Sequence, residues 1–478
     1  MTSKVFKHEL LSITPFQEQL HKTDRLSESL ICNHFRDFKK CTWTSTMPVK
    51  MNSSMDGDEV VYSVYNTFHF LNDSYMKFTS PSIKIRPDFK GKVQICWCRN
   101  MGNNIVESAV FKENNELFNS WDHTWADMYT QWFCQSGSGK RDRYNIGIGN
   151  IPELINWTES LPTHNFDVPQ PWFYSFYPGL KSSGFPILYK GSQTKAEHRY
   201  LFRRKITDLL RVRVLQPDNT WKELPKHLYH KYVNIKSTDT IKMPELWGDF
   251  SYVTDNELKQ FKCKSEYNYY YRDIIECDSL NPTSEGSVAD VPLHSKNPCL
   301  AFFWVAENQN ATQVNNHSNY TTDNHNIREG SDSINKVTLK YGEIKKFDNM
   351  DVDHFSINQV KNFPSAPEHS GYCAFSFSDN PASPDADVAM TFESNVSLHC
   401  RLVGPSTDES DCLGEPDIDD SESIHSESLH IEVTPTSDLI EPIIPRSKTN
   451  YITRVRLLVL RKFTVKKDDK GDYQFIIE

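Results

Sequence analysis

Several short residue groups have types and spacings that could support chemistry. Gly137-Ser138-Gly139-Lys140 looks superficially like a phosphate-binding loop. It lacks the required spacing between its glycines and the Gly-Lys pair, and Arg141 stands where that motif has Ser or Thr. The favoured interpretation is therefore a flexible turn.

Two thiols and an acidic cluster are the next candidates. Cys96 and Cys98 flank one Trp, so on an extended strand their side chains point to opposite faces, and chelation by this pair alone is not expected. We expect one buried and one half-exposed thiol. Asp351, Asp353 and His354 could be metal ligands or an acid/base pair. Without a metal-binding motif or a second His/Cys cluster, we interpret them as a solvated turn.

Histidines add little to this search. His317 and His325 belong to a polar stretch where metal binding would be incidental. The sequence therefore predicts no catalytic residue, no metal site, no cofactor and no enzymatic activity.

One strand-like stretch is strongly basic. Its cations are Arg199, Arg203, Arg204, Lys205, Arg211 and Arg213. The favoured interpretation is a set of strand-flanking charges satisfied by acidic groups of this or a neighbouring subunit. The alternative is a surface that faces nucleic acid or anionic lipid. Aromatic residues do not interleave at stacking spacing, which argues against single-strand binding.

Prolines surround an aromatic cluster in Val168-Pro169-Gln170-Pro171-Trp172-Phe173-Tyr174-Ser175. Such prolines cannot sit in a central strand ladder. They suit a rigid, extended connection that places large side chains at the base of a β-sandwich. The alternative is a sugar-binding platform built on Trp172.

Composition limits the class of protein. The chain has 478 residues, 12% of them aromatic, so disorder throughout is excluded. Its net charge is −10, but Asp408 to Glu441 holds twelve acidic residues and no Lys or Arg, so the remainder carries −10 + 12 = +2. A near-neutral body with an acidic appendage is not a nucleic-acid binder by charge alone.

Cysteine usage and hydropathy suggest a reducing compartment. The eleven cysteines are odd in number and show no CxxC pair. The longest apolar run, Cys299 to Ala306, is far shorter than the roughly 18 residues of a membrane-spanning helix. Met1 to Leu20 has no signal-peptide core. Seven Asn-x-Ser/Thr sequons, among them Asn310, Asn316 and Asn319, are therefore expected to be unmodified.

Strand patterns dominate wherever the sequence is periodic. Apolar residues alternate at 60–70, 337–341, 373–377 and 396–402, and residues 455–465 and 473–477 are predicted to form a hairpin around the turn 466–471. One helix is predicted over Glu116 to Phe133, with an apolar stripe of Phe118, Trp121, Trp125, Met128 and Trp132. A second is predicted from the cap Asn150 and the early Pro152 to about Leu161. The fold class is therefore mostly all-β with short helical excursions.

Two long segments lack an apolar period. Asn308 to Ser333 is expected to be an exposed loop, and Pro405 to Lys448 a disordered acidic loop whose removal should leave assembly intact. A boundary near Pro217 divides the chain. We predict an arm at 1–40, a first unit at 41–216 with a helical insertion at about 116–161, and a second unit at 217–478 that carries the loops 308–333 and 405–448. Each unit has the size of an eight-stranded jelly roll.

Two stretches resemble a known family. The first runs from Trp97-Cys98-Arg99-Asn100-Met101-Gly102 through Phe111 into Trp121 to Tyr129. The second is Pro169-Gln170-Pro171-Trp172-Phe173, followed by Gly184-Phe185-Pro186-Ile187-Leu188 and His198; Phe375-Ser376-Phe377 with Asn380-Pro381 is a weaker match. Together they resemble the double jelly-roll major capsid proteins of nucleocytoplasmic large DNA viruses. The acidic segment and the charged hairpin at the end of the chain depart from that pattern, as in a divergent member or paralogue.

The resemblance implies a structural role. It implies two consecutive eight-stranded antiparallel jelly rolls, and homotrimers that form pseudo-hexagonal capsomers and tile an icosahedral shell. The implied partners are other copies of the chain, minor capsid and penton proteins, and an inner membrane or chaperone during assembly, with no sequence-specific nucleic-acid binding. The implied location is the virion, with the host cytoplasm during assembly. Two alternatives stay open: a transient assembly scaffold of the same fold, or a cytosolic carbohydrate-binding β-sandwich that uses Trp172.

Overall fold

A computed structural model describes residues 45–134, 139–175, 184–189, 195–263, 266–378, 381, 390–404, 449–467 and 473–477. The expected arm at 1–40 and the expected acidic loop at 405–448 lie outside these residues. Within them every strand pairing is antiparallel. The mostly β fold class predicted from alternation is confirmed.

The N-terminal half of the chain builds two larger and two smaller sheets. One larger sheet has the order β1 (Ser45–Lys50), β15 (Glu245–Tyr252), β4 (Phe70–Ser80), β10 (His164–Pro169), with β11 (Phe185–Pro186) also on β4. The other has the order β2 (Asn52–Asp56), β3 (Glu59–Ser63), β12 (Ala196–Phe202), β7 (Val106–Glu113), β8 (Glu116–Asp122). The smaller sheets are β14 (Trp221–Glu223), β13 (Leu210–Leu215), β6 (Val93–Trp97), and the pair β5 (Ile83–Lys84), β9 (Ser160–Leu161).

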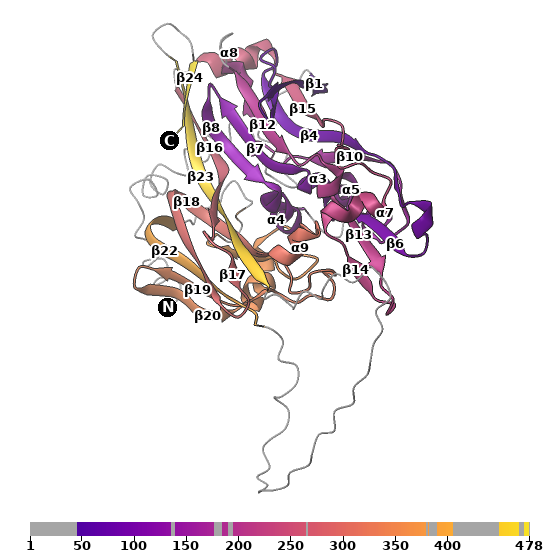
Figure 1. The fold of residues 1–478 in the computed structure, drawn as a ribbon. Coiled ribbons are helices and arrows are strands. Elements are labelled where there is room, and N and C mark those ends of the chain that lie inside the picture. Colours follow the sequence, from indigo (N-terminus) through magenta and orange to yellow (C-terminus); the bar gives the residue numbers. More distant parts are fainter. Residues whose placement is uncertain are drawn as a thin grey trace, which may run out of the picture.

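One large sheet contains the strands of the C-terminal half. Its order is β16 (Glu266–Asp278), β23 (Asn450–Lys467), β18 (Val288–Asn308), β22 (Met390–Leu402), β19 (Ile334–Tyr341), β20 (Ile344–Asp351). Short strands β17 (Thr283–Ser284) and β24 (Tyr473–Ile477) pair with β23, and β21 (Cys373–Ser376) pairs with β18. Figure 1 shows the yellow strand β23 running between β16 and β18, with the orange strand β22 next to β18.

Helices are short and interrupt the strands. The α-helices are α3 (Met101–Asn104), α4 (His123–Phe133), α5 (Lys140–Ile148), α6 (Pro152–Ile155), α7 (Tyr229–Tyr232), α8 (Asp255–Cys263), α9 (Gln309–Gln313) and α10 (Asp353–Ser356). The 3₁₀ turns are η1 (Pro87–Phe89), η2 (Ile187–Tyr189), η3 (Ile206–Asp208), η4 (Lys226–Leu228) and η5 (Asn358–Asn362). Among them α4 lies between the strands of the two halves (Figure 1).

Strand β18 separates two hydrophobic cores. Its side chains alternate between exposed and buried from Val288 to Lys296 and are then buried without interruption from Pro298 to Asn308. In this second part Phe303 belongs to the core shared with the N-terminal half, whereas Phe302 and Trp304 belong to the core of the C-terminal half. The apolar run at 299–306 is therefore a strand covered on both faces.

The predicted strands at 337–341, 373–377 and 396–402 correspond to β19, β21 and β22, and the predicted hairpin corresponds to β23 and β24. The alternation at 60–70 does not belong to one strand. It spans the end of β3 and the start of β4, which lie in different sheets. Val60, Tyr62, Val64, Phe68 and Phe70 are nevertheless all buried, as the alternation implies.

The predicted helix over Glu116 to Phe133 is half wrong. Residues Glu116–Asp122 form strand β8, and the helix begins only at His123. Asn114 and Asn115 have left-handed φ angles of 50° and 69°, which make the two-residue turn that pairs β7 with β8. Asp122 then caps α4 by accepting a hydrogen bond from the amide of Trp125 at 2.9 Å. Phe118 and Trp121 are buried from a strand, so their spacing only mimics a helix.

The second predicted helix is also too long. Pro152 begins α6 as expected, but the helix ends at Ile155, and Ser160 and Leu161 form strand β9. Helix α5 was not predicted, since Gly139-Lys140 was interpreted as part of a turn. In the structure Gly139 has φ +68° and precedes that helix, which begins at Lys140.

The strand pairing places the division of the chain later than Pro217. Pro217 lies in the hairpin between β13 and β14, and β15 pairs with β1 and β4 of the N-terminal half. The charged stretch that suggested a boundary near Pro217 is a strand and its turn. The first strand of the C-terminal sheet is β16, so the pairing changes between Tyr252 and Glu266.

We expect Trp125→Ala to destabilise the whole chain. Trp125 is fully buried on α4, and its ring lies 5.6 Å from that of Phe303 on β18. Removing a buried large aromatic costs about 3–5 kcal/mol through lost transfer energy and the cavity left behind. Urea denaturation followed by tryptophan fluorescence measures the loss, with the 89% exposed Leu280 changed to Ala as the control. A loss under about 1 kcal/mol would show that α4 is not part of the core.

Candidate functional site at the junction of the two halves

The segment 308–333, which we call the polar strap, lies between the N-terminal half and the C-terminal sheet. It was predicted to be an exposed loop, which is wrong for residues 315–321, whereas residues 322–332 are half-buried or exposed. The buried residues of the segment are Asn308, Ala311, the seven consecutive residues 315–321, and Ser333. Its polar side chains are buried because they are hydrogen-bonded, largely to the N-terminal half.

Amide side chains fasten the polar strap to the N-terminal half. The Asn315 amide donates to the carbonyls of Thr207 and Leu210, both at 2.7 Å. The Asn104 amide, at the end of α3, donates to the Ser318 hydroxyl at 2.7 Å. The polar atoms of the strap thus bond to groups more than 100 residues away in sequence instead of to water.

A buried carboxylate forms the centre of this junction. Asp127 on α4 accepts hydrogen bonds from Asn100 at 2.9 Å, from Asn103 at 3.3 Å and from the Tyr320 hydroxyl at 3.1 Å. Burial raises the pKa of Asp127, and the hydrogen bonds from neighbouring side chains oppose that rise. Asn100 reaches the carboxylate from a left-handed conformation with φ 50°. One carboxylate thus ties α3, α4 and the polar strap together.

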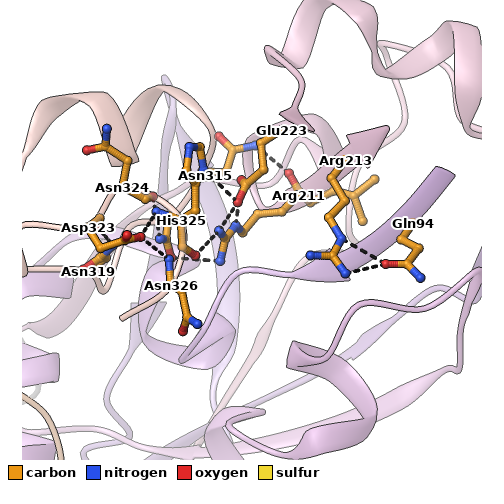
Figure 2. A network of polar contacts seen from close by, with 12 residues as sticks. Gln94, Arg211, Arg213, Glu223, Asn315, Asn319, Asp323, Asn324, His325 and Asn326 are labelled. Atoms are coloured by element: carbon orange, nitrogen blue, oxygen red, sulfur yellow. Dashed lines mark hydrogen bonds and ion pairs between the residues drawn. The ribbon is translucent and has the colours of Figure 1, made fainter. Parts of the chain in front are cut away.

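A second network binds the polar strap to the hairpin β13–β14 (Figure 2). Arg211 forms an ion pair with Glu223 and donates to Asn316 at 3.0 Å and to the His325 carbonyl at 2.9 Å. The His325 ring lies 3.3 Å from the same Glu223 carboxylate, and that hydrogen bond raises the pKa of His325. Arg213, on the same strand, bonds to Gln94 instead.

A buried arginine joins the C-terminal sheet to α4. Arg456 on β23 is fully buried and pairs with Asp122, the cap of α4, at 2.6 Å and with Asp278 at 2.5 Å. Burial raises the pKa of Asp122, but Arg456, His123 and the amide of Trp125 together lower it below its usual range. The two ion pairs compensate the charge of the Arg456 guanidinium inside the junction.

The favoured interpretation of the basic stretch, that acidic groups satisfy its charges, holds for Arg199 and Arg211 but not for the other four cations. Arg199 pairs with Asp56, Glu59 and Glu197. The Arg213 guanidinium lies over the rings of Trp157 and Trp221, at 4.6 and 4.7 Å from their centroids.

Three other cations of that stretch behave differently. Arg203 and Arg204 each donate one hydrogen bond to a backbone carbonyl, of Asn104 and Ile241 respectively, and Lys205 is exposed. Within the described ranges none of the three forms an ion pair. The sequence did not distinguish them from their neighbours.

The two thiols differ from their prediction. Cys96 and Cys98 are both fully buried, whereas one was expected to be half-exposed. Cys96 lies in β6, opposite Arg211 of the paired strand β13. Burial raises the pKa of each thiol to about 12, so both stay protonated at neutral pH.

The remaining candidates do not converge. Asp351 pairs with Lys336 on the surface, and the His354 ring contacts Gln359. Within the residues that the structure describes, no group of three or more His, Cys, Asp or Glu side chains is placed to hold a metal ion. In the same residues no helix is long and apolar enough to cross a membrane.

Trp172 is fully buried and cannot act as a sugar-binding platform. Its ring nitrogen donates to the Tyr200 hydroxyl at 3.1 Å, and the ring lies 5.0 Å from that of His198. His198 is itself buried and bonds to the Tyr174 hydroxyl at 2.7 Å. The segment 168–175 therefore fills the core of the N-terminal half, as the interpretation of its prolines predicted.

Sequence comparison extends the likeness beyond the residues that first suggested it. The profile of the large eukaryotic DNA virus major capsid protein family matches residues 275–403. The major capsid protein of Lymphocystis disease virus 1 (isolate Darai) is 25% identical over 405 residues, 78% of this chain and 83% of that protein. The major capsid protein of Invertebrate iridescent virus 6 is 22% identical over 375 residues, 72% and 76% of the two chains.

The chain resembles the major capsid proteins of large DNA viruses. Solved structures show that it also has the double jelly-roll fold of such capsid proteins. A chain of the PBCV-1 virus capsid superposes with a TM-score of 0.61 over 91% of this chain and 97% of that one, at 11% identity. The Faustovirus major capsid protein superposes with a TM-score of 0.60 over 88% and 90%, at 8% identity.

The junction is the part of this capsid-type fold that the sequence analysis missed. A usable signal was present: residues 308–322 contain no charged residue, no Pro and no Gly. Exposed, disordered segments are usually rich in those residues. An Asn-rich stretch without them is better suited to a fully hydrogen-bonded buried segment.

Acid should weaken the junction through His317. The His317 ring donates to the Asp208 carbonyl at 2.9 Å, and burial lowers the pKa of His317 well below its usual value of about 6.5. Below pH 6.5 His317 binds a proton in the unfolded chain but not in the folded chain. The free energy of unfolding therefore falls as pH falls. The slope approaches about 1.4 kcal/mol per pH unit for one group.

His317→Asn keeps a side-chain donor and removes the titration. We expect the difference in the free energy of unfolding between wild type and this variant to shrink or reverse from pH 7 to pH 5. Urea denaturation at both values measures it, with the exposed His227 changed to Asn as the control. A difference independent of pH would contradict the burial of a neutral His317.

Proposed function

We propose that this chain is a structural capsid subunit of a large double-stranded DNA virus, and that it resides in the virion. The observation that carries the proposal is the extent of the sequence likeness, which spans 72–78% of the chain and compares it with major capsid proteins. The fold adds support because it agrees with such proteins over about nine-tenths of the chain.

We further propose that three copies associate into a pseudo-hexagonal capsomer, and that capsomers tile an icosahedral shell. Two jelly rolls per chain would give three chains six similar units, so a trimer can occupy a hexagonal position. Edge strands with apolar side chains support assembly: Met55 on β2 is 57% exposed, and Ile344 on β20 is 64% exposed. Exposed strand edges of this kind are suited to contacts between subunits.

Minor capsid proteins, penton proteins, and a membrane or chaperone during assembly remain proposed partners on the basis of the resemblance. The carbohydrate-binding alternative has lost its support, because the Trp172 ring is buried. A transient scaffold of the same fold would be absent from purified mature particles, whereas a shell subunit would be abundant in them. Mass spectrometry of purified particles distinguishes these two roles.

The native mass of the purified full chain tests the trimer. We expect light scattering after size exclusion to give three times 55.5 kDa, or about 166 kDa. Dilution over a hundredfold range should leave that species intact, since capsid subunit contacts bury large areas. A stable 55.5 kDa monomer at high concentration would contradict the homotrimer.

A further inference from the structure

A cavity of about 310 Å³ opens between the N-terminal half and the polar strap. One wall comes from the end of β12 and the loop after it, with Arg203, Arg204 and Lys205, and from Lys226 in η4. The opposite wall is Thr312 in α9 with Asn315 and His317 of the polar strap. The cavity therefore lies between the N-terminal half and the polar strap, which are joined by direct hydrogen bonds at other points of the junction.

Positive charge predominates in this cavity. Four cationic side chains line it against the carboxylates of Glu107 and Asp208. Asp208 is already paired with Lys226 at 3.0 Å. Arg203 and Arg204 donate one hydrogen bond each to backbone carbonyls, so most of their guanidinium N–H groups have no protein acceptor within the described residues.

The electrostatics of His317 agree with this excess of positive charge. Burial is the main cause of its lowered pKa, and Arg203 and Lys226 lower it further. The neighbouring His123 is half-buried, and burial and Arg203 lower its pKa as well. Both rings are thus held neutral beside the cations, which leaves the positive charge of the cavity to be balanced from outside the chain.

We propose that this cavity binds a small multivalent oxyanion of the phosphate class, which bridges the N-terminal half to the polar strap. Guanidinium forks match phosphate oxygens with paired hydrogen bonds, and a lysine adds a mobile charge. The volume corresponds to about ten water molecules, which is enough for an orthophosphate or a pyrophosphate with part of its hydration shell. Such a site is distinct from the role of the chain in a shell.

Calorimetric titration of the full-length protein with sodium pyrophosphate, and separately with sodium orthophosphate, tests the proposal at constant ionic strength. We compare wild type with Lys205→Gln, because Lys205 is exposed, lines the cavity and forms no ion pair within the described residues. Losing one charge-assisted contact should weaken binding by about tenfold or more. Lys222→Gln is the matched control: Lys222 is an exposed lysine on β14 that does not line the cavity, and its variant should bind as wild type does.

Bridging has its own readout. Hydrogen exchange followed by mass spectrometry should show slower exchange in residues 312–317 when pyrophosphate is present, and no such change in Lys205→Gln. Circular dichroism confirms that both variants are folded.

Three results would overturn the proposal. One is that neither pyrophosphate nor orthophosphate binds at a concentration 10-fold or more above a millimolar dissociation constant. Another is equal affinity in Lys205→Gln and wild type, which would place the anion elsewhere. The third is binding of a single-stranded oligonucleotide that Lys205→Gln weakens while neither small phosphate binds, which would assign the cavity to a nucleic-acid backbone instead.

Discussion

The structure depends on two paired strands, β18 and β23, parts of which are buried on both faces. From Cys299 to Ala306, successive residues of β18 enter different cores, with Phe303 facing α4 and Phe302 and Trp304 facing the C-terminal core. Leu458 and Leu457 on the paired strand β23 divide in the same way. Separating the halves would expose one whole face of these strands to water, at about 25 cal/mol for each Å² of apolar surface. The two halves are therefore a single structural unit.

The polar groups at the ends of these buried strands also need hydrogen-bond partners. The polar strap continues directly from β18 and supplies them: Asn308 caps α9, and Asn315, Ser318 and Tyr320 bond to the N-terminal half. Gly371, with φ +96°, allows this packing, since a Cβ there would lie 2.5 Å from the Tyr320 carbonyl oxygen. Hydrophobic burial thus brings the halves together, and the polar strap fixes how they are oriented. A rigid orientation is what a subunit of the proposed shell requires.

Alternation was the reliable part of the sequence. It located β19, β22 and the hairpin β23–β24, because alternate residues of each face a hydrophobic core. It failed where a local turn overrides the apolar spacing: the Asn114-Asn115 turn makes β8 a strand, although Phe118 and Trp121 continue the spacing of α4. It also failed for the polar strap, since buried amides look like solvated ones until their partners are known. Asn104, Asp127 and Glu223 are far from the polar strap in sequence, and no pattern within 308–333 names them.

Hydrogen exchange of the native protein, measured in low denaturant, tests most directly whether the halves form one unit held by the polar strap. The account predicts that amides of residues 315–321 exchange with the same opening free energy as those of β18 at 299–306 and of α4. Exchange of 315–321 at the rate of an exposed loop, while β18 and α4 stay protected, would contradict it.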